Sequence, residues 1–158
     1  MITKNLISLM ISIFSNTQSF KLKNLQGSET TWSNRGFFDM FTSDLHYKDY
    51  SNMTDDNIVM YLLLGSGTTT ATSDDYKLDS IESNYTVITQ NHTVFTNTYG
   101  NQILVINRII QNSSDSAITI NEMGLCGWQI LFAREVLAEP VVLQPGEKHT
   151  FTMTIGLE

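Results

Sequence analysis

The residues that could carry out chemistry in this chain are few and widely spaced. Three histidines, His46, His92 and His149, lie far from one another and from the single cysteine, Cys126. No H-E-x-x-H, H-x-E or paired-cysteine spacing is present, so the sequence encodes no zinc motif. A lone cysteine between strand-like segments is more often a packed apolar residue than a nucleophile. We therefore expect no enzymatic activity, no bound metal and no cofactor.

A glycine-rich segment at 65–70, Gly-Ser-Gly-Thr-Thr-Thr, follows an apolar run and invites comparison with phosphate-binding loops. A P-loop needs Lys followed by Ser or Thr at a fixed spacing, and Ala71, Thr72 and Ser73 stand there instead. The dinucleotide-binding pattern needs a third glycine and a helix, which are missing. We expect these glycines to let the chain leave a buried strand and turn sharply.

An acidic cluster, Asp74, Asp75 and Asp79, is the best candidate for binding a hard cation. It lacks the alternating oxygen ligands and the terminal Glu of a calcium loop. The alternative is a structural role in which Ser73 or Asp74 caps a short helical turn at 75–77. We favour the cap.

The composition fits one domain with a terminal arm, since the chain has 158 residues. Nine Lys and Arg against sixteen Asp and Glu give a net charge of −7. Too few cations are present to neutralise a row of phosphates, which argues against a nucleic-acid partner. Hydrophobic residues make up 41% of the chain, enough for a real core. The single cysteine excludes an intrachain disulfide.

Residues 1–20 are predicted to form an amphipathic arm. Apolar residues fall at the i, i+3, i+4, i+7 spacing of one helical stripe, and these are Leu6, Leu9, Met10 and Ile13. Serines interrupt the apolar run, no small-x-small cleavage site follows it, and a bilayer span needs about 20 residues. We expect a helix or arm that docks on a partner or on its own core, and neither a signal peptide nor a membrane span.

Residues 21–158 are predicted to form an all-β domain, because short apolar runs rich in β-branched residues alternate with turn residues. In the clearest strand, Phe151, Met153 and Ile155 alternate with threonines. The predicted strands are 58–64, 85–89, 93–96, 102–111, 117–121, 128–137, 141–143 and 149–155. This spacing indicates an antiparallel β-sandwich, jelly-roll or immunoglobulin-like, preceded by a short N-terminal helix or arm.

The predicted strand 128–137 carries apolar residues on both faces, which indicates that it is covered on both sides, within the sandwich or at an oligomer interface. Arg134 shares a face with Phe132, and an arginine there suggests either a buried ion pair with Glu122 or a contact across subunits. Phe132 and Arg134 therefore join the four apolar arm residues as candidate interface residues.

Two tryptophans, Trp32 and Trp128, support a second hypothesis. Aromatic side chains can serve as platforms for sugars, and β-sandwiches often act as carbohydrate-binding modules. The competing interpretation, which we favour, is that both tryptophans belong to the core.

Two stretches point to a family. Residues 64–78 read Leu-Gly-Ser-Gly-Thr-Thr-Thr-Ala-Thr-Ser-Asp-Asp-Tyr-Lys-Leu, and residues 112–155 include Ile-Thr-Ile-Asn-Glu-Met-Gly-Leu and a Pro-Gly-Glu turn before the threonine-alternating strand. Together they resemble small structural proteins of tailed bacteriophages, over about half the chain but not over residues 27–57. The resemblance implies a non-enzymatic virion protein of the head surface, neck or tail, whose partners are other virion proteins and copies of itself. The alternative is a carbohydrate-binding β-sandwich, and a virion surface protein that grips host glycans would combine the two.

Overall fold

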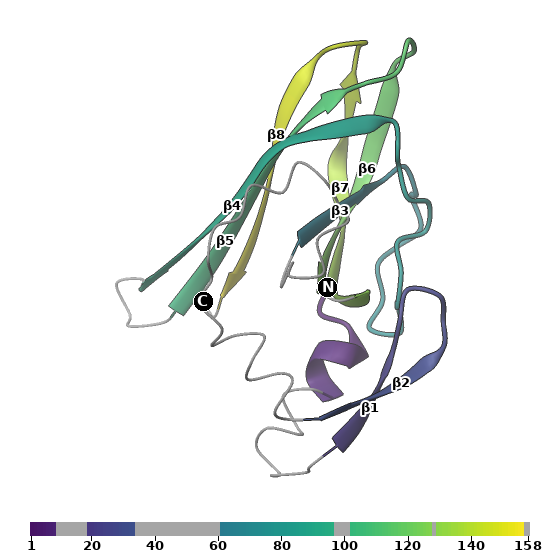
Figure 1. The fold of residues 1–158 in the computed structure, drawn as a ribbon, viewed down its shortest axis with the longest axis vertical. Helices are drawn as coiled ribbons and strands as arrows, with labels where there is room; N and C mark the ends of the chain where they lie inside the picture. The colour runs from purple at the N-terminus through teal and green to yellow at the C-terminus, as the bar shows by residue number, and fades with distance from the viewer. Residues whose placement is uncertain (9–18, 34–60, 97–101, 128, 157–158) are drawn as a thin grey trace.

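The computed structural model describes residues 1–8, 19–33, 61–96, 102–127 and 129–156 (Figure 1). This part of the chain consists of antiparallel strands and one short helix at residues 4–8, which confirms the all-β, sandwich-like prediction. The strands are β1 (Ser19–Lys23), β2 (Glu29–Ser33), β3 (Tyr61–Gly65), β4 (Tyr85–Thr96), β5 (Gln102–Asn112), β6 (Ile118–Gly127), β7 (Ile130–Leu143) and β8 (Lys148–Gly156).

The strands form two three-stranded sheets, with the orders β3-β6-β7 and β4-β5-β8, and a separate β1-β2 hairpin. Every strand pair is antiparallel. The hairpin lies beside the N-terminal helix at one end of the molecule (Figure 1).

The main core lies between the two sheets, and among the described side chains buried ones come from β3, β5, β6, β7 and β8. Phe151 and Met153 of β8 point into it while Thr150, Thr152 and Thr154 are exposed, as the alternation predicted. The buried members of this core are Leu62, Leu64, Ile106, Ile110, Ile118, Ile120, Met123, Leu125, Ala133, Leu143, Phe151 and Met153. Each large aliphatic side chain buried in this way contributes about 1.5–3 kcal/mol of transfer free energy.

Irregular pairing in β6 decides which of its side chains leave this core. The register shifts between Ile120 and Glu122, so even-numbered residues face the core up to Ile120 and odd-numbered ones face it from Met123. Because a one-residue slip moves side chains to the other face of a sheet, the bulge turns Glu122 to the outer face.

Several predicted strand boundaries were wrong. β7 runs on through Pro140, where two strands were predicted. Residues 137–140 have no partner in β6 and β7 is an edge strand, so no ladder bond to β6 needs an N–H from Pro140. β4 is also continuous, since all of its residues except Ile88, which lies at a bulge, pair with β5. The β1-β2 hairpin was not predicted, because its short polar sequences lack an apolar run. Gly146 has φ +77°, which fits the predicted Pro-Gly turn.

Candidate functional site

The first residues of the chain lie along the outer edge of β7 as a short added strand. Ile2 pairs antiparallel with Ala133. The Thr3 N–H donates to the Phe132 carbonyl over 3.0 Å, and the Arg134 N–H donates to the Met1 carbonyl over 2.9 Å. An unpaired edge is a template for another strand, so residues 1–3 occupy the position that a partner strand would otherwise take.

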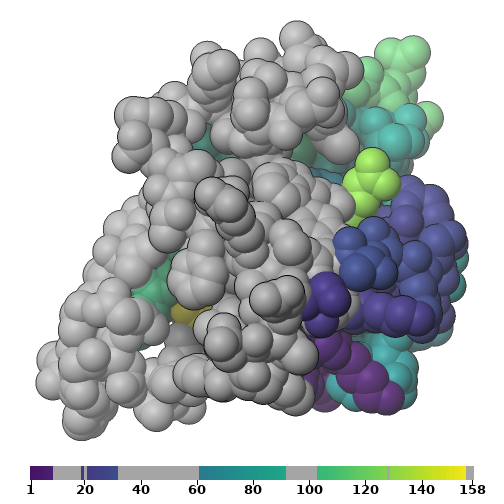
Figure 2. Space-filling model, turned by 60° about the horizontal axis from the view of Figure 1, so that its bottom comes forward, coloured from purple at the N-terminus to yellow at the C-terminus, as the bar shows by residue number. Residues whose placement is uncertain are grey.

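Two buried polar side chains fasten this segment. The Thr3 hydroxyl donates to the Leu131 carbonyl over 2.8 Å. The Asn5 amide donates to the carbonyls of Lys23 and Leu131 over 2.8 and 3.2 Å, and its oxygen accepts from the Lys23 N–H over 2.9 Å. The segment is therefore tied to both β7 and β1, and it forms one continuous surface with the hairpin (Figure 2).

Apolar arm residues remain on the surface. Met1 is 63% exposed, Ile2 44% and Ile7 43%. Of the arm residues that the sequence singled out, Leu6 is half-buried in the helix. Leu9, Met10 and Ile13 lie outside the described residues, so their assignment to an interface stays a prediction.

A second feature is the loop that joins β3 to β4, residues 66–84, which lies over the outer face of β6. Glu122, with none of its surface exposed, accepts hydrogen bonds from three backbone N–H groups of this loop. The donors are Gly67 at 3.1 Å, Asp79 at 3.2 Å and Ser80 at 2.9 Å. One buried carboxylate therefore fixes both ends of a long loop.

Arg134 completes the network from β7. Its Nε donates to the Glu122 carboxylate and its Nη1 to the Asp75 carboxylate, both over 2.7 Å, and its Nη2 donates to the Thr69 carbonyl over 2.9 Å. The predicted ion pair with Glu122 is thus present. Arg134 is 2% exposed and Phe132 is 3% exposed, so in this fold neither side chain is presented to a partner.

The network shifts two pKa values. Desolvation alone would lower the pKa of Arg134, but the hydrogen bonds to Asp75 and Glu122 outweigh it and raise that pKa. Desolvation alone would raise the pKa of Asp75, but hydrogen bonds from the Thr72 backbone and from Arg134 outweigh it and lower that pKa. Both shifts favour the charged forms, so the ion pair persists at neutral pH.

The glycines near this loop serve close packing. A Cβ on Gly67 would lie 2.4 Å from Glu122 Oε1 and from the Asp79 side chain. A Cβ on Gly124 would lie 2.7 Å from Leu131 and 2.8 Å from Leu78. Only glycine lets the loop and β6 approach this closely.

The capped helical turn predicted at 75–77 is absent. Asp75 instead reaches back to Thr72, accepting from its N–H over 2.9 Å and from its hydroxyl over 2.8 Å. This turn leaves Asp75 facing Arg134, because the long-range ion pair outweighs local helix propensity. Within the described residues, no group of three or more His, Cys, Asp or Glu side chains is placed to hold a metal ion.

Sequence reasoning missed a buried arginine between the sheets. Arg108 is 3% exposed and donates to the carbonyl of Leu62 at the outer edge of β3. The N–H of Leu62 donates to the Gln90 side chain over 3.0 Å. Burial lowers the pKa of Arg108 and raises the pKa of Tyr61 to about 12. The signal in the sequence was an arginine at an inward position of β5, between Ile106 and Ile110.

Cys126 is fully buried against Leu63, Leu78 and Leu131, and burial raises the pKa of its thiol well above the ordinary value. It packs as a small apolar residue, as predicted.

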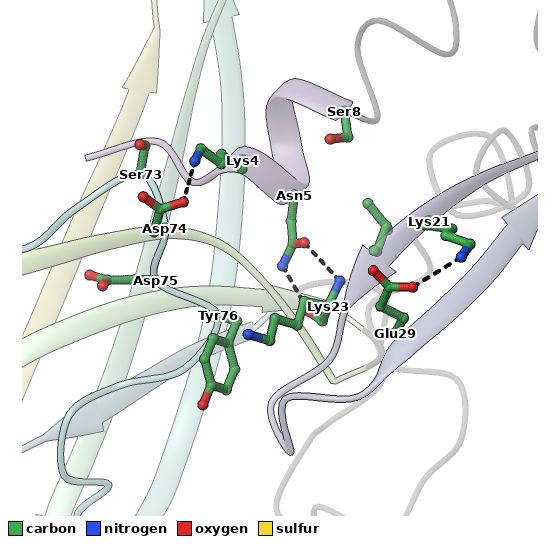
Figure 3. Close-up of a pocket in the computed structure, with 11 residues that line it drawn as sticks. Lys4, Asn5, Ser8, Lys21, Lys23, Glu29, Ser73, Asp74, Asp75 and Tyr76 are labelled. Atoms are coloured by element: carbon green, nitrogen blue, oxygen red, sulfur yellow. Dashed lines mark hydrogen bonds and ion pairs between the residues drawn. The ribbon is translucent and has the colours of Figure 1, made fainter.

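A groove opens between the N-terminal helix, the hairpin and the 66–84 loop (Figure 3). Its volume is about 360 Å³, within the range of about 300–1,000 Å³ that is usual for small-molecule sites. The lining residues are Lys4, Asn5, Ser8, Lys21, Leu22, Lys23, Glu29, Ser73, Asp74, Asp75 and Tyr76. The groove is therefore rich in ammonium, carboxylate, hydroxyl and amide groups.

The structure does not describe the side chains of the two tryptophans that the sequence suggested as sugar platforms. Trp32 belongs to β2 by its backbone, opposite Phe20, but its side chain lies outside the described part of the structure, as does all of Trp128. In the described segments, no helix is long and apolar enough to cross a membrane.

No protein-family model, curated protein or solved structure matches this chain, so its resemblance to phage structural proteins stands as a prediction from its own residues.

Proposed function

We propose that the protein is a non-enzymatic structural subunit of a bacteriophage virion, which assembles with copies of itself and with other virion proteins. The resemblance of residues 64–78 and 112–155 to phage structural proteins supports the assignment to a virion. One observation supports the mode of assembly, and it is the pairing of residues 1–3 with the edge of β7.

Strand addition of this kind is suited to joining subunits. The backbone groups of β7 that residues 1–3 satisfy are the same in every copy, so the arm of a neighbouring copy makes the same contacts. Exchange of an identical element between copies costs little, because almost all bonds of the closed form are kept. The exposed side chains of Met1, Ile2 and Ile7 add apolar surface that a neighbour can cover.

Segment 64–78, one of the two stretches that resemble phage structural proteins, has a structural role that agrees with this proposal. It supplies Gly67 and Asp75 to the network around Glu122 and Arg134, which fixes a loop across the sheet whose edge receives the arm. A firmly held sheet presents its edge in a constant geometry, as repeated assembly requires.

The test is a disulfide placed between the arm and β7 in the full chain. Ile2 and Ala133 face each other, and their neighbours make the flanking backbone hydrogen bonds, so the pair is of the non-hydrogen-bonded type. Such pairs have Cα atoms about 4.5 Å apart, within the range of about 4.4–6.8 Å for disulfides. The double variant Ile2→Cys with Ala133→Cys, oxidised and run without reductant, gives covalent multimers if arms exchange.

A closed monomeric disulfide, together with a monomeric native mass over a concentration series, would contradict arm exchange. The single variants Ile2→Cys and Ala133→Cys are the controls, since neither alone can form the designed bridge. The buried Cys126 thiol, with its raised pKa, is a poor competitor for oxidation.

Carbohydrate binding is the second candidate function, and the groove beside Tyr76 is the observation that favours it. Hydroxyl-rich ligands need many hydrogen-bonding groups on a concave surface, and this groove supplies them.

A further inference from the structure

We infer that the groove between the N-terminal helix, the β1-β2 hairpin and residues 73–76 binds an acidic saccharide, with Lys23 as the main contact for its carboxylate. This inference rests on carbohydrate binding, the second candidate function, and does not depend on arm exchange.

The distribution of charge carries the first step. The chain has a net charge of −7, yet four of its six lysines gather at this groove. Lys4, Lys21 and Lys23 line it, and the Lys77 ammonium lies 6.0 Å from the centre of the Tyr76 ring. The lining also holds the carboxylates of Glu29, Asp74 and Asp75, but Asp75 is already paired with Arg134, so the four lysines outnumber the carboxylates that are left. Such a surplus of cations on an acidic protein raises the local concentration of anionic ligands.

The second step is the state of Lys23. Its ammonium lies 4.1 Å from the centre of the Tyr76 ring, and it pairs with no carboxylate of the described residues. Figure 3 shows the end of the Lys23 side chain next to this ring. Gly27 leaves room for the ring, because a Cβ at that position would come within 3.2 Å of it. A cation–π contact orients the ammonium without neutralising its charge, so Lys23 is ready to receive an anion.

The other two lysines already have partners, Lys4 with Asp74 and Lys21 with Glu29. These pairs are strongly exposed, so they contribute little and rearrange readily. A groove lined by both ammonium groups and carboxylates suits a ligand that carries one carboxylate and several hydroxyl donors. A continuous polyanion such as a nucleic acid would meet Asp74 and Glu29 with repulsion, so a sugar acid is the better match.

The experiment is a calorimetric titration of the full-length protein with sialyllactose, a trisaccharide with one carboxylate, with the neutral trisaccharide maltotriose and a glycerol-phosphate oligomer as comparisons. We expect sialyllactose to bind at least about tenfold more tightly than either comparison. Lys23→Gln, which keeps a polar side chain but removes the charge, is expected to weaken that binding about tenfold. Lys148→Gln, an exposed lysine of β8 outside the groove, is the matched control and should leave it unchanged.

Each other outcome overturns the inference. Equal binding of maltotriose and sialyllactose leaves carbohydrate binding in place but removes the acidic preference. Preferential binding of the glycerol phosphate shows that charge alone is recognised. Full affinity in Lys23→Gln removes the assigned contact. Absence of binding by all three probes removes carbohydrate binding at this groove as well.

Discussion

Replacing Arg134 by methionine tests the network that holds the 66–84 loop over β6. Methionine fills much of the same space but cannot pair with Glu122, which has no exposed surface. Breaking a buried ion pair by removing one partner costs about 3–5 kcal/mol. Three loop N–H groups still solvate the Glu122 carboxylate, so we expect a loss near the lower end, about 3 kcal/mol.

The assay is urea unfolding of the full chain, followed by circular dichroism, with hydrogen exchange read at the loop amides. A loss of about 3 kcal/mol is large against the total stability of about 5–15 kcal/mol that is usual for a domain. The N–H groups of Gly67, Asp79 and Ser80 are expected to lose protection before those of the core strands, because they depend on the position of the Glu122 carboxylate.

Lys21→Met is the matched control. Lys21 also forms an ion pair, with Glu29 at 3.0 Å, but the two side chains are 70% and 68% exposed. Exposed pairs contribute about 0–1 kcal/mol, so this variant should unfold almost like the natural protein. If Arg134→Met costs no more than Lys21→Met and the loop amides stay protected, the reasoning about Glu122 and Arg134 is refuted.

Three further predictions concern pH and packing. The pKa of Asp75 is lowered on folding, so its carboxylate stabilises the fold above its unfolded pKa of about 3.9. This contribution is lost as the pH falls further, so the stability of Asp75→Asn should fall less steeply with acid than that of the natural protein. Because the pKa of Tyr61 is raised to about 12, stability should fall as the pH rises from about 10 to 12. Absorbance at alkaline pH follows the ionisation of Tyr61. If stability falls with pH in Tyr61→Phe as it does in the natural protein, this prediction is contradicted. Gly124→Ala should destabilise the fold by about 1–3 kcal/mol, because the added methyl group overlaps Leu131 and Leu78; an unchanged urea midpoint would show that the two leucines can move aside.

The amino-acid sequence by itself determined the fold class and the strands with strict alternation. In β8, threonines alternate with Phe151, Met153 and Ile155, and this local pattern is enough to predict which face is buried. The pairing of Arg134 with Glu122 was also predictable, because an arginine among apolar residues of a strand needs a buried partner.

Only the tertiary structure decided what the polar residues between those strands do. Asp75 was predicted to lie next to a helix cap, but Arg134, 59 residues further along the chain, draws it into the network. The seating of residues 1–3 on β7 and the gathering of lysines around Tyr76 depend on segments far apart in sequence. Side-chain periodicity reports only on near neighbours, whereas ion pairs, strand addition and grooves arise where distant segments meet.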